Sequence, residues 1–65
     1  MRQQAQMAIE AFAVIEDEIA RIHDELAAEH PERRDEYRHT AERARRGARR
    51  SRAALRTLTG LPPEA

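Results

Sequence analysis

The chain has 65 residues, contains no cysteine, and carries twelve basic and twelve acidic residues, so its formal net charge is zero. This length allows one small domain, and the absence of cysteine excludes a disulfide framework and a thiolate metal site. No run of about 18 apolar residues is present, so we expect no membrane-spanning helix. The N-terminus also lacks the pattern of a signal peptide, and we therefore expect a cytoplasmic protein.

Residues 3–29 are expected to form the first helix, because no glycine or proline interrupts them and good helix formers dominate their composition. Apolar residues recur there at alternating steps of three and four, which is the heptad pattern of a helix-packing seam. The members of this seam are Ala5, Ala8, Phe12, Ile15, Ile19, Ile22 and Leu26. We expect the seam to face the second helix.

Pro31 ends the first helix, since a proline pushes the preceding residue, His30, out of the helical region. Proline is also favoured as the first residue of a helix, which predicts a second helix over residues 32–59. Its seam is made mostly of small residues, namely Tyr37, Ala41, Ala44, Ala48, Ser51, Leu55 and Leu58. Gly60 is the expected C-terminal cap, and the two prolines that follow prevent continuation.

The short connection between the two helices favours antiparallel neighbours. The sequence therefore predicts an all-α fold, an antiparallel two-helix hairpin that forms one domain over residues 1–60. Residues 61–65 are expected to be a disordered tail.

The first helix carries more apolar surface than one neighbouring helix can cover. Residues 11–15 are apolar all the way round the helix, which is typical of a helix buried on more than one side. We expect a homodimer in which two hairpins form a four-helix bundle. The predicted oligomer interface consists of Met7, Ile9, Ala13 and Val14.

Acidic and basic residues are segregated along the chain. Residues 16–36 hold nine acids and three arginines, whereas residues 37–56 hold eight arginines and one acid. Arginine is always charged, and its planar fork binds carboxylates and phosphates. We predict that the second helix presents a partner-binding face made of Arg43, Arg45, Arg46, Arg49, Arg50, Arg52 and Arg56.

Two partners and one structural alternative fit this arginine-rich face. An acidic protein is the favoured partner, and a nucleic acid is the alternative that the same side chains would bind through phosphates. Zero net charge and a pI near 6.8 weigh against general nucleic-acid binding. In the structural alternative the arginines form a solvated face that acids of the first helix partly balance.

No motif indicates catalysis, a metal or a cofactor. Glu36 and His39 have the Glu-x-x-His spacing of carboxylate metal bundles, but the heptad pattern places His39 outward. His23 and His30 could form only a weak metal-binding set, and Ser51 has no histidine in register to activate it. We therefore predict a non-enzymatic interaction or regulatory protein without catalytic residues, metal or cofactor.

Overall fold

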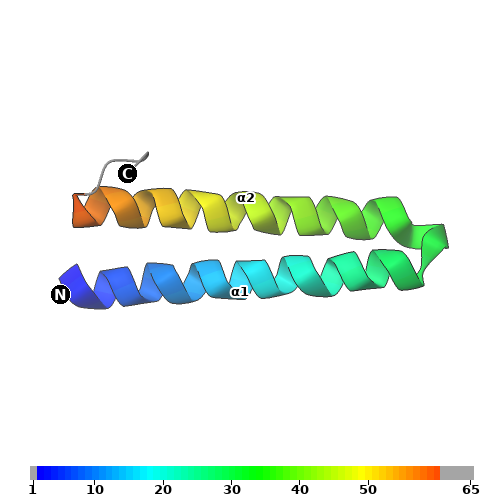
Figure 1. Ribbon diagram of the computed structural model, residues 1–65, viewed down its shortest axis with the longest axis horizontal. Helices are drawn as coiled ribbons and strands as arrows, with labels where there is room; N and C mark the ends of the chain where they lie inside the picture. The colour runs from blue at the N-terminus through cyan, green and yellow to red at the C-terminus, as the bar shows by residue number, and fades with distance from the viewer. Residues whose placement is uncertain (1, 61–65) are drawn as a thin grey trace.

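The computed structural model describes residues 2–60, and the predicted disordered tail at residues 61–65 lies outside this range. Helix α1 covers Arg2–Glu29, the 3₁₀ turn η1 covers Pro31–Arg33, and helix α2 covers Arg34–Thr59. The two helices run antiparallel and side by side (Figure 1). No strand occurs within residues 2–60, so the predicted all-α hairpin is confirmed.

The turn forms where the sequence predicts it, but helix α2 starts later than expected. His30 has extended backbone angles, φ −129° and ψ 77°, as a residue before proline should. The backbone N–H of Arg33 then donates to the carbonyl of His30 at 2.9 Å. Residues 31–33 therefore form a tighter 3₁₀ turn, and the α-helix begins at Arg34 instead of residue 32.

The C-terminal end of α2 confirms the predicted glycine cap. Gly60 has φ 77°, in the left-handed region that glycine adopts without steric cost. Its N–H donates to the carbonyl of Thr57 at 3.2 Å, which satisfies one of the free carbonyls at the helix end. Helix α2 consequently stops at Thr59, as the sequence predicts.

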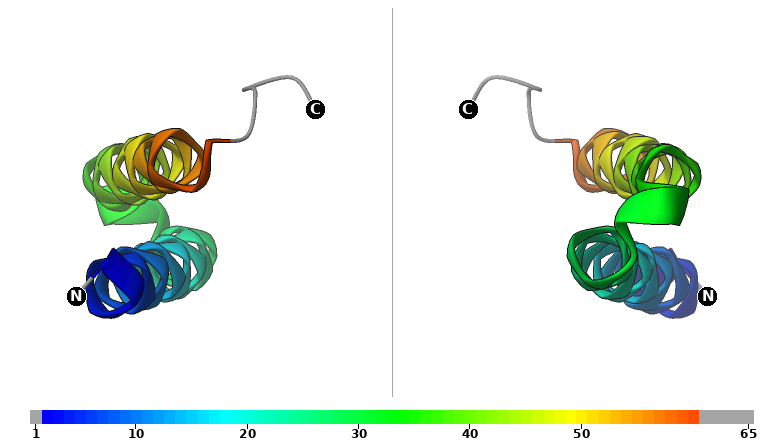
Figure 2. Two further views of the ribbon diagram at one scale, coloured as in Figure 1. Left: turned by 90° about the vertical axis from the view of Figure 1, so that its left-hand side faces the viewer. Right: turned by 90° about the vertical axis from the view of Figure 1, so that its right-hand side faces the viewer.

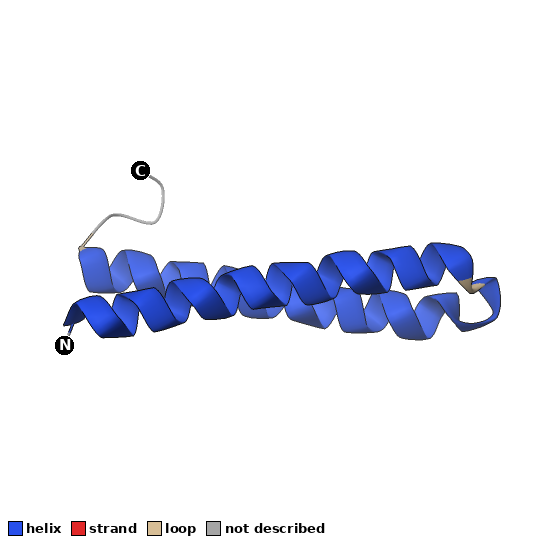
Figure 3. Cartoon of the chain, turned by 90° about the horizontal axis from the view of Figure 1, so that it is seen from below, coloured by secondary structure: helices blue, strands red, loops and turns tan. Residues whose placement is uncertain are grey.

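Small residues make the contact between the two helices. The buried apolar residues are Ala13, Ala20 and Ala27 of α1 and Ala41, Ala44 and Ala48 of α2, each exposed by 4% or less. Interaxial distance depends on the side chains at the contact, so alanine on alanine lets the helices approach closely. The helices cross at a shallow angle (Figure 3), and no other described element lies over either side of the pair (Figure 2).

The prediction that the seam of large apolar residues on α1 faces α2 is wrong for most of that seam. Phe12 is 51% exposed, Ile15 is 55% exposed and Ile22 is 41% exposed, whereas Ile19 and Leu26 are half-buried. Because each helical residue turns by about 100°, Phe12 and Ile19 lie about 100° round α1 from the alanines that face α2, and Ile15 and Ile22 lie about 160° from them. The hairpin thus buries an alanine core and leaves Phe12, Ile15 and Ile22 open to solvent.

Candidate functional site

The hairpin has a groove along each of its two sides, between α1 and α2. One, which we call the ion-pair groove, is lined by acids of α1 and arginines of α2. Its lining comprises Asp17, Ala20, Arg21, Asp24, Arg45, Ala48, Arg49 and Arg52. The second, which we call the arginine groove, combines apolar residues of α1 with arginines of α2. Its lining comprises Phe12, Glu16, Ile19, Thr40, Arg43, Ala44, Arg46, Gly47 and Arg50.

Arginines in the ion-pair groove bind acids of their own chain. Arg52 Nη2 lies 2.6 Å from Asp17 Oδ2, and Arg45 forms an ion pair with Asp24 one heptad further along both helices. The hydrogen bond from Arg52 holds the pKa of the Asp17 carboxyl below its ordinary value and raises the pKa of Arg52. These contacts cross between α1 and α2, so two arginines of the predicted partner-binding face are ion-paired within their own chain.

Arg49 belongs to the same side of α2 as these cross-helix pairs. Its Nη2 atom lies 3.3 Å from Glu42 Oε1, and Arg45 Nη1 lies 3.8 Å from Glu42 Oε2. Glu42 therefore sits between two arginines of its own helix. Exposed pairs of this kind are worth about 0–1 kcal/mol each, so they orient side chains more than they stabilise the fold.

The arginines of the arginine groove are not ion-paired in the way that those of the ion-pair groove are. Arg43, Arg46 and Arg50, which we call the arginine row, line this groove of about 520 Å³. Within residues 2–60, none of the three has a carboxylate within ion-pair distance. All three are exposed, so their guanidinium groups are available to an anionic group from outside the hairpin.

Glu16 is the one acid that lines the arginine groove, and it lies over Gly47 of α2. A Cβ atom built at Gly47 would be 3.0 Å from Glu16 Oε2 and 3.3 Å from Glu16 Cδ. Glycine at this position therefore leaves room for the carboxylate of Glu16 between the helices. A single carboxylate cannot neutralise three arginines, so the groove keeps an excess of positive charge.

A line of large apolar side chains runs beside the arginine groove on α1. We call it the α1 stripe, and it consists of Phe12, Ile15, Ile19, Ile22 and Leu26. Phe12 and Ile19 also line the groove itself, so apolar surface and unpaired arginines are adjacent. Exposed apolar surface that is contiguous and rimmed by polar residues is typical of an interaction site.

Two of the four residues predicted for the oligomer interface lie on the surface. Met7 is 65% exposed and Val14 is 58% exposed, whereas Ala13 is 1% exposed and is held against α2. Ile9 is half-buried beside Leu55, in a cavity of about 280 Å³ that Ala13 and Val14 also line. Ala13 is thus part of the hairpin core, and it is not open to a second copy.

Arg56, the last arginine of the predicted face, lies apart from the arginine row. It is half-buried at the open end of the hairpin, in the cavity beside Leu55. Its Nε atom is buried and has no hydrogen-bond partner among the described residues. The seven arginines of the predicted face therefore lie in three separate environments.

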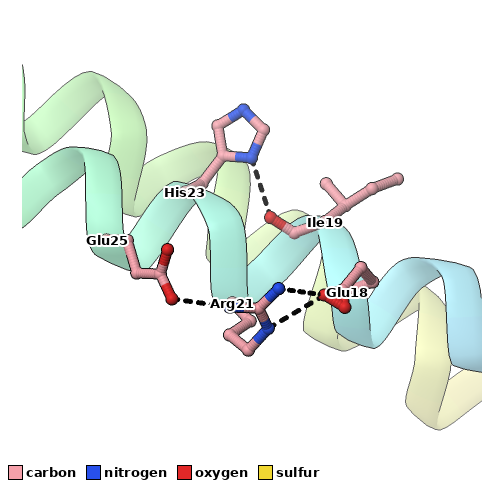
Figure 4. A network of polar contacts seen from close by, with 5 residues as sticks. All are labelled: Glu18, Ile19, Arg21, His23 and Glu25. Atoms are coloured by element: carbon pink, nitrogen blue, oxygen red, sulfur yellow. Dashed lines mark hydrogen bonds and ion pairs between the residues drawn. The ribbon is translucent and has the colours of Figure 1, made fainter.

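Two of the histidines, His23 and His30, make local contacts close to Tyr37. His23 Nδ1 is 2.8 Å from the carbonyl of Ile19, while Arg21 lies between Glu18 and Glu25 and points away from His23 (Figure 4). The rings of His23 and His30 each lie 6.0 Å from the ring of Tyr37. Within residues 2–60, no group of three histidines or acids is placed to hold a metal ion.

Neither helix in the described part of the chain combines the length and hydropathy needed to cross a bilayer. No family model matches the chain, and no curated protein or solved structure is significantly similar to it. A functional assignment therefore depends on the geometry of the two grooves and the α1 stripe.

Proposed function

We propose that this chain is a non-enzymatic interaction protein whose arginine groove docks a helix of complementary chemistry. The docked helix lays an apolar face on the α1 stripe and places acidic side chains against the arginine row. Helix-in-groove binding of this kind depends on apolar anchors at i, i+3, i+4 and i+7, which is the spacing of the stripe itself. Oligomerisation through α1 is part of the same proposal.

The observation that carries the proposal is the exposure of Phe12, Ile15 and Ile22 in a hairpin whose buried apolar residues are all alanines. A chain of 65 residues is marginal even with a well-filled core, and small scaffolds of this kind usually gain stability by association. Covering the α1 stripe with a partner helix would supply the large buried side chains that the hairpin lacks. The proposal therefore links binding to stability.

The arginine row determines the chemistry of the docked helix. Three guanidinium groups beside an apolar surface favour a partner with carboxylates next to its own apolar face, because such charges steer association and fix orientation. A nucleic acid would satisfy the arginines but would leave Phe12 and Ile15 exposed. An acidic protein helix satisfies both parts of the surface.

Fluorescence anisotropy with a labelled amphipathic peptide tests the proposal. The peptide carries leucines at heptad spacing, with glutamates on one flank, and it is titrated at low salt with the full chain. Replacing the arginine row by Gln at Arg43, Arg46 and Arg50 should abolish binding. The matched control replaces Arg45, Arg49 and Arg52 by Gln, which removes the same charge from the ion-pair groove and should leave binding within about threefold.

A duplex DNA of equal charge separates the two classes of partner. Ile15→Ser should weaken peptide binding and leave any DNA binding unchanged, because only the peptide needs the α1 stripe. A nucleic-acid function would replace this proposal if the chain bound DNA more tightly than the peptide. The logarithm of the DNA binding constant should then fall with the logarithm of the salt concentration, with a slope of about −0.9 per phosphate contact. No binding of either ligand, together with a chain that is monomeric, would contradict it.

A further inference from the structure

A helix with the chemistry proposed for the docked partner is present in this chain. Helix α1 carries an apolar stripe at heptad spacing, and acids lie along one edge of that stripe. Ile19 lies between Ala20, which faces α2, and Glu18, and Leu26 lies between Ala27 and Glu25 in the same way. Since neighbouring residues of a helix point about 100° apart, Glu18 and Glu25 flank the stripe on the side away from α2.

We propose that the occupant of this surface is a second copy of the chain, docked with its α1 parallel to the first. The two-fold axis then runs along the helices, and each stripe residue meets its own copy. This inference rests on the proposed function, because it identifies the acidic helix that the groove takes. The α1 stripe would be covered, and Phe12, Ile15 and Ile22 of both copies would form the missing core.

The charges that flank the α1 stripe favour one direction for the second copy. In a parallel pair of helices, the left flank of one apolar stripe faces the right flank of the other. The arginine row, on the α2 side of the stripe, is thereby brought towards Glu18 of the second copy. In an antiparallel pair, each flank of the stripe would instead face the same flank of the other copy. The two arginine rows would then approach each other, and Glu18 would face Glu18 of the second copy.

The positions along the helices agree with this arrangement. Glu16 lies against Gly47, and Ile19 lines the same groove as Arg43 and Ala44. Residue 18 of α1 is therefore level with residues 43–46 of α2. In a parallel pair in register, Glu18 of the second copy is at this same level, within reach of Arg43 and Arg46.

Glu18 can accept hydrogen bonds from two arginines at once. Within its own chain it accepts hydrogen bonds from Arg21, with Arg21 Nε 2.9 Å from Glu18 Oε2, and its side chain remains 47% exposed (Figure 4). A carboxylate has about four lone-pair sites, so the contact with Arg21 leaves capacity for an arginine of the second copy.

Disulfide trapping distinguishes the two directions, because the chain has no cysteine of its own. Ala8→Cys continues the heptad positions of Ile15 and Ile22, on the exposed side of α1. Mild oxidation should convert most of this variant to a covalent dimer. The two substituted positions would lie about 30 Å apart in an antiparallel pair centred on the stripe. Ala28→Cys, which is exposed but off the stripe, is the matched control and should remain largely uncross-linked.

A charge exchange tests the contact itself, with the dimer dissociation constant measured by sedimentation. Glu18→Arg and Arg43→Glu should each weaken the dimer by roughly 5- to 10-fold, and the double variant should regain most of the loss. Arg38→Glu makes the same charge change seven residues before Arg45, on the other side of α2, and should leave the constant unchanged. Failure of the double variant to recover would overturn the parallel arrangement.

The remaining outcomes separate this inference from the proposed function. A chain that stays monomeric but binds the acidic peptide overturns the second copy as occupant and supports the groove as a docking site. A monomer that binds no peptide overturns both. Cross-linking of Ala28→Cys in place of Ala8→Cys would overturn the stripe as the dimer contact.

Discussion

The carboxylate of Glu16 on α1 lies over the backbone of Gly47 on α2, with Oε2 3.0 Å from the point that a Cβ atom of residue 47 would occupy. Only the far end of a flexible side chain would meet the methyl group of Gly47→Ala. We expect this substitution to stabilise the hairpin by up to about 1 kcal/mol, because alanine has the higher helix propensity. Urea denaturation at fixed protein concentration measures the change.

The other glycine of the described chain is the control for this prediction. Gly60 has φ 77°, where any residue with a Cβ atom is strained. Gly60→Ala should therefore destabilise the chain by about 1 kcal/mol. A destabilising effect at both glycines would show that Glu16 cannot move aside.

The alanine contact between the helices should not tolerate larger side chains. Ala41 is fully buried, and Ala41→Leu would push α2 away from α1 at a cost of about 1–3 kcal/mol. Ala53→Leu makes the same change at an exposed position of the same helix and should be nearly neutral. Thermal melts followed by circular dichroism compare the two variants, and equal melting temperatures would contradict the alanine core.

The ion pair between Asp17 and Arg52 should make stability depend on pH on the acid side. The Asp17 pKa is held below its ordinary value of 3.8, chiefly by the hydrogen bond from Arg52. The pair therefore stabilises the folded chain above pH 3.8, and this contribution is lost as the pH falls through the lower folded pKa. The urea midpoint of Asp17→Asn should be lower than that of the unmodified chain at pH 7.

The same comparison over a series of pH values below 3.8 provides the test of direction. As the Asp17 carboxyl of the folded chain takes up a proton, it loses its charge, so the two urea midpoints should converge as the pH falls. A difference that persists undiminished in acid would mean that packing of the Asp17 side chain, and not its charge, stabilises the fold.

Much of the fold follows from a few residues that interrupt the helical pattern. Pro31 and Gly60 predict where the helices end, and both ends agree with the structure. The packing face does not follow in the same way, because α1 carries two seams at heptad spacing and the larger residues favour the wrong one. The overlooked signal is the match between Ala13, Ala20 and Ala27, seven residues apart, and the small residues of α2.

The charged residues contain a second signal of the same kind. Asp17 and Asp24 are seven residues apart, as are Arg45 and Arg52, and the two sets pair across the helices. This match predicts both the register and the side of the hairpin on which the pairs lie. In the sequence alone, the arginines of α2 form a single cluster. Only the register of the two helices shows which of these arginines pair with acids of α1 and which do not.

The α1 stripe should make stability depend on protein concentration. Association stabilises a folded chain by mass action, so the melting temperature of the unmodified protein should rise on concentration. Ile15→Glu should remove this dependence, because a charge cannot be buried between two stripes. Val14→Glu tests the interface predicted from the sequence. Loss of the concentration dependence with Val14→Glu, but not with Ile15→Glu, would move the contact to that face.

The central claim is that a second copy covers the α1 stripe, and sedimentation equilibrium of the unmodified chain tests it most directly. The predicted result is a mass twice the 7.5 kDa of one chain, falling towards the monomer only on dilution. A fully helical protein that remains at 7.5 kDa over the whole accessible concentration range would contradict the claim.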